Sequence, residues 1–169
     1  VPDWPLSYGS LTPPWVGNIR YEHGHRMVAA TVGLLAVCLA VWLWRREPRR
    51  WVRRLGLAAV GTVVAQGLLG GVTVLMLLPP AVSISHACLA QAFFASTVAL
   101  ALVTGRTWRE AGPGSGRLSP LAQQGVAATA AIFVQLALGA GLRHKVFTVV
   151  PHLVWAAAVA GLILWTAYR

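Results

Sequence analysis

Residues 55–78, LGLAAVGTVVAQGLLGGVTVLMLL, form an apolar run that contains no acidic or basic side chain. At a rise of about 1.5 Å per residue, a helix of this length crosses a hydrocarbon core of about 30 Å. Runs of comparable length and polarity occupy residues 27–44, 84–104, 119–142 and 151–168. The short alternating segments that are typical of membrane β-barrels are absent. The sequence therefore predicts an all-α, polytopic membrane helical bundle with about five transmembrane helices.

The composition agrees with a membrane protein. Hydrophobic residues make up 57% and charged residues 11% of the 169 residues, whereas soluble domains carry roughly 25% charged residues. A net charge of +10 is also compatible with nucleic-acid binding, but six arginines gather in residues 45–54 and three more in residues 105–118. Arginine-rich loops beside apolar runs are typical of the cytoplasmic side of membrane proteins. We therefore expect a lipid bilayer as partner, no nucleic acid, and both loops in the cytoplasm.

The chain divides into two parts at its longest loop. Residues 105–118 are rich in Gly and Ser and are predicted to link an N-terminal half, residues 1–104, to a C-terminal part, residues 119–169. A short internal echo, QGLLGG at residues 66–71 and QLALGA at residues 135–140, suggests that the two parts are related. After each of these two segments, a histidine lies near the start of the next predicted helix. The Gly and Ala content of these helices permits oligomers without requiring them.

Three histidines carry the chemistry. His25, His86 and His152 each open a helix that runs from the outside inward, so we expect all three at one depth near the outer surface. Imidazoles near the ends of membrane helices usually face the bundle interior, and histidine pairs from facing helices hold haem iron in bundles. Zinc is disfavoured because no Asp or Cys accompanies these residues. We interpret the three histidines as candidate haem-iron ligands.

Other readings of the histidines stay open. Each one alone is also explained by interfacial hydrogen bonding. His23, two residues from His25, points away from whatever His25 faces, and His144 suits contact with either a haem propionate or solvent. Basic residues on the outer side are consistent with haem binding, because the haem propionates accept charge-assisted hydrogen bonds. The candidates for this contact are Arg20, Arg26, Arg143 and Lys145.

Glu22 precedes His25 by three residues and shares a face with it if the helix extends that far back. A first-turn acid can simply complement the helix dipole. It can also transfer protons beside a reacting haem substituent. Both readings stay open, and Glu22 is the candidate catalytic residue. Cys38 and Cys88 lie in apolar runs and are predicted to be packing residues.

Five motifs together resemble the haem A synthase family. They are residues 2–9 (PDWPLSYG), 21–26 (YEHGHR), 66–74 (QGLLGGVTV), 86–90 (HACLA) and 135–144 (QLALGAGLRH). The resemblance is collinear over nearly the whole chain. It implies an eight-helix protein of two pseudo-repeated four-helix halves, in a bacterial inner membrane, with the haem-binding histidines near the extracytoplasmic face.

The resemblance also implies an activity. Family members convert haem O into haem A, for terminal oxidases, by oxidising a ring methyl group to a formyl group. By position, His25 and His86 would hold the iron of the substrate haem, and Glu22 would be the acid. His152 would be one ligand of a haem b cofactor in the second half. An electron donor, a haem O synthase and a terminal oxidase would be the partners.

This sequence departs from the family pattern in two respects. One family helix is missing before Val1 and two are missing after Arg169, so we expect a truncated chain with an incomplete second haem site. Val1 and Ser7 stand where many members carry cysteines, so no disulfide-dependent step is expected. Two other functions stay open: a membrane cytochrome b that only transfers electrons, which should tolerate Glu22→Gln, and a haem-binding assembly subunit without chemistry.

Overall fold

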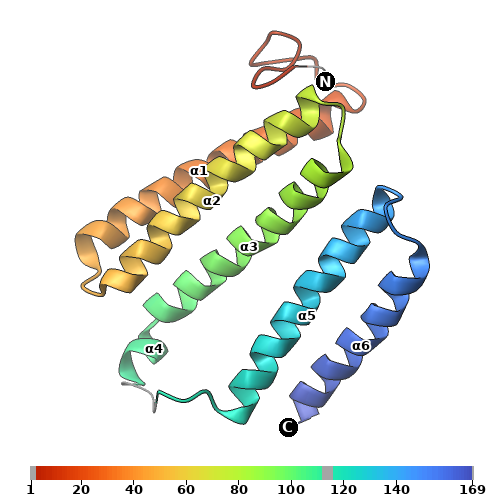
Figure 1. Ribbon diagram of the computed structural model, residues 1–169. Coiled ribbons are helices and arrows are strands. Elements are labelled where there is room, and N and C mark those ends of the chain that lie inside the picture. Colours follow the sequence, from red (N-terminus) through yellow and green to blue (C-terminus); the bar gives the residue numbers. More distant parts are fainter. Residues whose placement is uncertain (1–2, 112–115, 169) are drawn as a thin grey trace. The chain divides into compact units, whose positions relative to one another are not determined.

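The computed structural model describes residues 3–111 and 116–168. Over these residues the chain is helical and contains no named strand. The helices are α1 (Ile19–Arg46), α2 (Arg50–Leu75), α3 (Pro80–Thr104), α4 (Arg106–Glu110), α5 (Pro120–Arg143) and α6 (Val149–Tyr168) (Figure 1). All except α4 are long and apolar enough to cross a membrane, which makes five spans in the described residues. The prediction of an all-α bundle with about five transmembrane helices is confirmed.

The outer surface of the helices is apolar. Large side chains on α1 and α6 are mostly exposed, among them Leu34 at 65%, Trp42 at 69% and Leu164 at 71% of their maximal area. A soluble protein rarely exposes large contiguous apolar patches. Lipid acyl chains satisfy such a surface, so the chain is a multi-pass membrane protein.

The helix ends differ from the apolar runs. α1 begins at Ile19, well before residue 27, because helical hydrogen bonding continues into the polar segment beyond the apolar run. α2 ends at Leu75 rather than at residue 78, because Leu77 and Leu78 adopt positive φ angles of 55° and 63°. The Leu78 N–H then donates to the Thr73 carbonyl at 2.8 Å, which closes the last helical turn in the manner of a Schellman motif.

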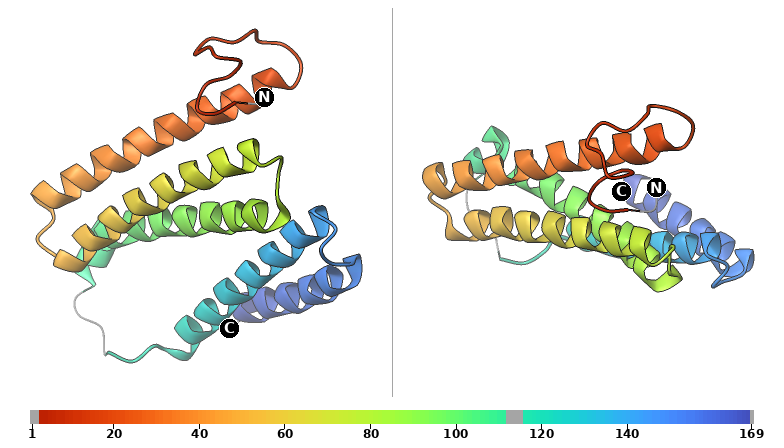
Figure 2. Two further views of the ribbon diagram at one scale, coloured as in Figure 1. Left: turned by 45° about the horizontal axis from the view of Figure 1, so that its top comes forward. Right: turned by 90° about the horizontal axis from the view of Figure 1, so that it is seen from above.

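The chain forms two compact units, Val1–Gly105 and Arg106–Arg169. In the first unit, α2 packs against both α1 and α3, and these two flanking helices do not pack against each other in the described residues. Figure 2 shows α2 between them. In the second unit, α5 and α6 form an antiparallel hairpin. The predicted linker, residues 105–118, contains α4, and its residues 112–115 lie outside the described residues.

The first unit is packed most tightly at the end that carries the arginine-rich loop. A cluster of buried apolar side chains from all three helices lies there: Leu43, Val52, Ala59, Leu100 and Val103. A Cβ on Gly56 would come within 2.8 Å of the Leu43 side chain. This close packing fixes α1 and α3 against α2 at one end and leaves the other end to be organised by different contacts.

A buried ion pair closes this end. Glu47 is only 6% exposed, and its two oxygens accept from Arg49 Nε at 2.6 Å and Nη2 at 3.0 Å. Arg49 Nη2 also donates to the Val103 carbonyl at 2.9 Å. The hydrogen bond with Glu47 raises the pKa of Arg49 above its ordinary value. The turn between α1 and α2 is thereby tied to the end of α3.

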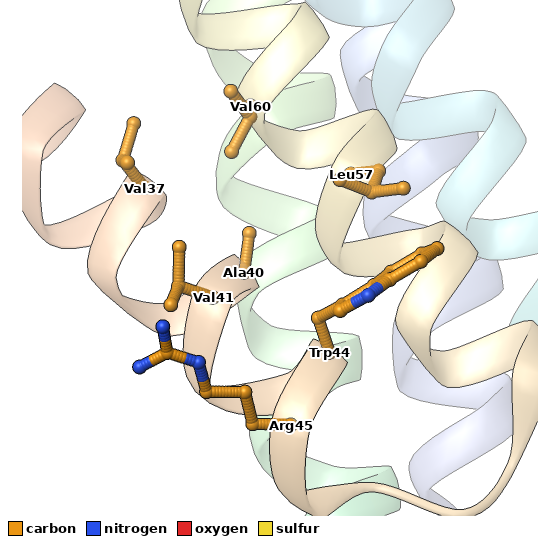
Figure 3. Close-up of a pocket in the computed structure, with 7 residues that line it drawn as sticks. All are labelled: Val37, Ala40, Val41, Trp44, Arg45, Leu57 and Val60. Carbon is orange, nitrogen blue, oxygen red and sulfur yellow. The ribbon is translucent and has the colours of Figure 1, made fainter.

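A shallow apolar groove lies between α1 and α2 near the same end. Figure 3 shows that Trp44 lies beside α2 and that Arg45 extends away from the helices. The groove has a volume of about 360 Å³ and is lined by Val37, Ala40, Val41, Trp44, Arg45, Leu57 and Val60. It belongs to the C-terminal part of α1, so it is separate from the histidines at the start of that helix.

We expect Glu47→Gln to lower the temperature of thermal unfolding in detergent, because it leaves Arg49 beside a partner without charge. Differential scanning fluorimetry measures this. The matched control is Glu110→Gln, which removes an exposed pair with Arg106 (side chains 61% and 89% exposed). Exposed pairs of this kind contribute about 0.5 kcal/mol or less, so the control should not shift the transition. Equal shifts in both variants would contradict the structural role of Glu47.

Candidate functional site

His25 and His86 lie at the same end of the first unit. Each is the seventh residue of its helix, α1 from Ile19 and α3 from Pro80, and both helices run in the same direction on either side of α2 (Figure 1). Their end is opposite to the arginine-rich loop. The structure therefore places two of the three predicted iron ligands, His25 and His86, at the same end of the first unit.

The His86 ring lies directly against the backbone of α2 at Gly70. A Cβ on Gly70 would come within 3.2 Å of His86 Cε1 and 3.8 Å of Nδ1. A contact this short is tighter than most real Cβ contacts, so a methyl group at position 70 would require the His86 ring to shift by a few tenths of an ångström. Glycine at this position permits the close approach of the ring.

Gln66 anchors the same histidine from one turn earlier on α2. Its Nε2 donates to the His86 carbonyl at 2.9 Å and lies 3.3 Å from His86 Nε2. Residues four apart share one face of a helix, so Gln66 and Gly70 meet the imidazole together. These three residues form what we call the Gln66 clamp.

The second unit repeats this arrangement on α5 and α6. A Cβ on Gly139 would come within 3.0 Å of His152 Cε1. Gln135 Nε2 lies 3.1 Å from His152 Nδ1 and 3.3 Å from Nε2. Trp155, one turn after His152 on α6, donates from Nε1 to the carbonyl of Ala131, one turn before Gln135 on α5, at 2.9 Å. We call Gln135, Gly139 and His152 the Gln135 clamp.

An aromatic ring covers a further glycine beside each clamp. In the first unit a Cβ on Gly71 would come within 2.7 Å of the Trp4 ring, and in the second a Cβ on Gly141 would come within 2.4 Å of the Phe147 ring. Both rings come from the segments outside the spans. Each unit therefore closes its histidine end with an aromatic side chain placed on bare helix backbone.

The loop before α1 has a defined structure. Ser7 and Ser10 pair through two backbone hydrogen bonds of 3.1 Å, and Tyr8 and Gly9 between them have positive φ angles of 53° and 69°. Asp3 accepts from the Tyr8 and Gly9 N–H groups at 2.8 Å each. These two hydrogen bonds, that of Gly9 first, lower the pKa of Asp3 below its ordinary value of 3.8.

Arg26 joins this loop to α1. Its Nη1 donates to the Pro5 and Leu6 carbonyls and to Ser7 Oγ. Its Nη2 donates to the Asp3 carbonyl at 2.9 Å and to Glu22 Oε1 at 2.6 Å. Since α1 extends back through residue 22, Glu22 and Arg26 form an i,i+4 ion pair. The loop contacts occupy both terminal nitrogens of Arg26, and its contact with a propionate stays a prediction.

The remaining outer residues have distinct surroundings. Ser7 Oγ lies 3.1 Å from His23 Nδ1, and the His23 ring meets Trp15 edge-on at 6.0 Å, so His23 belongs to the loop. Arg20 donates to the Tyr21 hydroxyl at 2.9 Å. In the second unit Arg143 is exposed in the last turn of α5, and His144 is half-buried as its C-cap. Lys145 follows with a positive φ angle of 58°.

The donor types at the histidine end of the first unit suit haem iron, because imidazole is one of its usual protein ligands. Gln66 Oε1, Ser83 Oγ and His86 Nδ1 are buried and have no hydrogen-bond partner among the described residues. Gly67 has open space where its side chain would be, and α2 separates the two helices that carry the imidazoles. No group of three or more His, Cys, Asp or Glu gathers around one point in the described residues. Haem needs only one or two protein ligands, and His25 and His86 can supply them.

The sequence motifs include Gln66, Gln135 and Arg26, but they did not predict the contacts of the glutamines with the histidines or of Arg26 with the loop before α1. The spacing of four residues in Gln66-x-x-x-Gly70 and Gln135-x-x-x-Gly139 already put each pair on one helix face. The amide partner, however, is on the next helix, and no local pattern identifies it. The docking of Trp4 on Gly71 likewise joins residues far apart in the chain.

Fold and site together define a polytopic membrane protein that presents paired imidazoles at one end of a helical unit. The profile of a family described as cytochrome oxidase assembly protein matches residues 17–146, more than half of the chain. The chain belongs to this family, and the resemblance to haem A synthases is confirmed.

Several curated relatives are similar to the chain. A heme A synthase of Halalkalibacterium halodurans is 35% identical over 103 residues, which are 59% of this chain and 32% of the relative. One of Symbiobacterium thermophilum is 39% identical over 84 residues, 49% of this chain and 28% of the relative. One of Brucella ovis is 33% identical over 108 residues, 57% of this chain and 30% of the relative. The chain thus covers about a third of these relatives. No solved structure matches.

We expect Asp3→Asn to increase hydrogen–deuterium exchange at Tyr8 and Gly9, because a neutral amide is a weaker acceptor than a carboxylate. Since the folded pKa of Asp3 is lowered, its contribution is complete at pH above the ordinary value of 3.8 and is lost as the pH falls through the lowered pKa. The exchange rates of Tyr8 and Gly9, corrected for their intrinsic pH dependence, should stay constant from neutral pH down to the ordinary value of 3.8. The amides of α1 serve as internal control. Unchanged exchange in the variant would contradict the assignment.

Proposed function

We propose that the chain is part of a haem A synthase, in which the first unit binds haem O and oxidises one of its methyl groups to a formyl group. The observation that carries this proposal is the pair of imidazoles, His25 and His86, at one end of two helices that flank α2. The name of the matched relatives supports the same activity. Haem supplies the redox chemistry of its iron when bound.

His25 and His86 are proposed as the iron ligands of the substrate haem. His86 is held by the Gln66 clamp, whereas His25 is exposed on α1. A fixed ligand on one side and an accessible one on the other suit a group that has to enter and leave. A substrate haem must do both, because haem A goes on to a terminal oxidase.

Glu22 is proposed to move protons during the oxidation. Converting a methyl into a formyl group removes two hydrogen atoms, adds one oxygen atom and is a four-electron oxidation of the carbon, so protons as well as electrons have to be transferred at the site. Glu22 lies one turn before His25, and its side chain is 33% exposed. Its carboxyl group pairs with Arg26, and a carboxyl group at this position can take part in proton transfer.

The second unit is proposed to hold a haem b cofactor through His152. The Gln135 clamp resembles the Gln66 clamp in residue types and contacts, which supports two pseudo-repeated halves. Arg143, His144 and Lys145 at the end of α5 are proposed to contact haem propionates. A haem O synthase would supply the substrate, and an electron donor would act on the second unit.

The proposed location is a bacterial inner membrane, with His25 and His86 near the extracytoplasmic face. Loop 45–54 carries six arginines at the opposite end of α1 and α2. The positive-inside rule puts such a loop in the cytoplasm. A membrane cytochrome b that only carries electrons is not favoured, since the relatives are named as synthases.

We expect His25→Ala and His86→Ala each to reduce the haem bound by the purified protein, because each removes a ligand of the same iron. Haem content is measured as the pyridine haemochrome per protein. His23→Ala is the matched control, since His23 contacts Ser7 and Trp15 in the loop. Normal haem content and absorption bands in both ligand variants would refute the site.

We expect Glu22→Gln to keep its haem and to lose haem A formation by about 10²-fold or more, the usual contribution of a proton-transferring group. Cells that make haem O are extracted, and haem A is quantified by chromatography and mass. Glu110→Gln is the control for the loss of one carboxylate. If Glu22→Gln made normal amounts of haem A, Glu22 would be a structural partner of Arg26 only.

A further inference from the structure

The apolar groove between α1 and α2 (Figure 3) has a rigid floor of helix backbone. Ala40, which lines it, is only 5% exposed, and a Cβ on Gly56 of α2 would lie 3.7 Å from Ala40 Cα. Small residues at such a crossing let two membrane helices approach closely. Other lining side chains stay exposed, among them Val41 at 45% and Leu57 at 48% of their maximal area. The groove is therefore a fixed feature of this helix pair with an open apolar surface.

A tryptophan and two arginines lie at the end of the groove nearest loop 45–54. Trp44 and Arg45 line the groove, and Arg45 extends away from the helices (Figure 3). The guanidinium carbon of Arg53 lies 5.5 Å from the centre of the Trp44 ring. Neither Arg45 nor Arg53 forms an ion pair in the part of the chain that the structure describes. Two cations are thus available to a ligand where the groove reaches the loop.

This end of the groove lies at the level of the lipid headgroups. Arg45 is in the last turn of α1, directly after the apolar part of the helix. Tryptophan rings at the ends of membrane spans prefer the interface between membrane and water, and arginine side chains extend toward it. From there the groove runs back along α1 to Val37, which lies within the hydrocarbon layer. A matching ligand therefore combines an apolar chain with a negative group at the interface.

We propose that this groove binds one anionic phospholipid from the leaflet that faces loop 45–54. An acyl chain lies along α1 between Val37 and Trp44, and the phosphate contacts Arg45 and Arg53. Guanidinium groups bind phosphate through charge-assisted hydrogen bonds, and basic pockets between membrane helices bind anionic lipid headgroups. The lipid site goes beyond the proposed function and does not depend on haem.

Charge favours an anionic lipid over other occupants of the groove. Loop 45–54 contains six arginines and one glutamate, so it attracts a negative headgroup. A second copy of the chain in the same membrane orientation would bring the same loop to the same depth, and the repulsion of like charges would oppose its docking. A zwitterionic phospholipid has the same acyl chains but no net charge to offset the two arginines.

The test is native mass spectrometry of the complete chain in detergent, titrated with dioleoylphosphatidylglycerol, which is anionic, or dioleoylphosphatidylcholine, which is zwitterionic. The wild type is expected to bind one phosphatidylglycerol more tightly than phosphatidylcholine. Arg45→Gln and Arg53→Gln should each lower the affinity for phosphatidylglycerol about fivefold, the contribution of one arginine near a membrane surface, and leave that for phosphatidylcholine unchanged. Arg46→Gln is the matched control, because Arg46 is exposed beside Arg45 but does not line the groove. Its effect should be much smaller.

A second pair of variants tests the place of the acyl chain. Val41→Trp fills the groove with an indole ring and is expected to lose most of the lipid-bound species. Leu35→Trp is its control, because Leu35 is 62% exposed on α1 and does not line the groove. The arginine variants alone decide the question if Val41→Trp does not fold.

Three outcomes would overturn the lipid site. They are equal wild-type affinities for the two lipids, a loss in Arg46→Gln as large as that in Arg45→Gln, and a lipid-free dimer that Val41→Trp dissociates. The second would mean diffuse attraction to the loop, and the third would mean that a second copy of the chain occupies the groove. Because lipid binding is measured without haem, these outcomes are separate from the haem content of His86→Ala, which tests the proposed function.

Discussion

The close approach of an imidazole ring to bare helix backbone underlies everything else at the histidine ends. His86 lies on Gly70 and His152 on Gly139, at distances at which a methyl group would require each ring to shift by a few tenths of an ångström. A larger residue would push the ring outward and separate it from the glutamine one turn away. The glycine therefore determines both where the imidazole lies and which group can bond to it. The absence of a side chain on Gly70 and Gly139 therefore helps to set the position of each imidazole.

The first unit combines a densely packed end with a more open one. Apolar side chains of α1, α2 and α3 interlock near the arginine-rich loop, and the buried pair of Glu47 and Arg49 reinforces them. At the other end, α1 and α3 are held apart by α2, and a loop organised by Arg26 covers it. The packed end gives the helices that carry His25 and His86 a rigid base, which a functional site requires.

The motifs that identify the family also explain the loop. In residues 2–9, Asp3 accepts the N–H groups of a turn in which Gly9 has a positive φ angle. Trp4 packs on Gly71, and the Pro5 and Leu6 carbonyls accept from Arg26. Motifs far apart in the sequence thus form one structural unit beside His25. Much of their specificity serves to assemble the histidine end rather than to contact a ligand.

Hydropathy was sufficient to predict the five spans, because the bilayer demands about 20 apolar residues whatever the packing. It could not predict the ends, because hydrogen bonds such as Leu78 to Thr73 end α2 inside an apolar run. The position of His25 and His86 at one end of the first unit followed from helix direction alone. The partners of Arg26 and of the histidines did not, because they depend on side chains from different helices. The common depth of His152 with the other two stays a prediction.

The distribution of acids supports a division of labour between the two clamps. The chain has four acidic residues, Asp3, Glu22, Glu47 and Glu110, and none lies in the sequence of the α5–α6 hairpin. Only the first unit therefore has a carboxylate within a turn of a proposed iron ligand. Proton-coupled oxidation of a substrate needs such a group, whereas electron transfer through a bound haem does not.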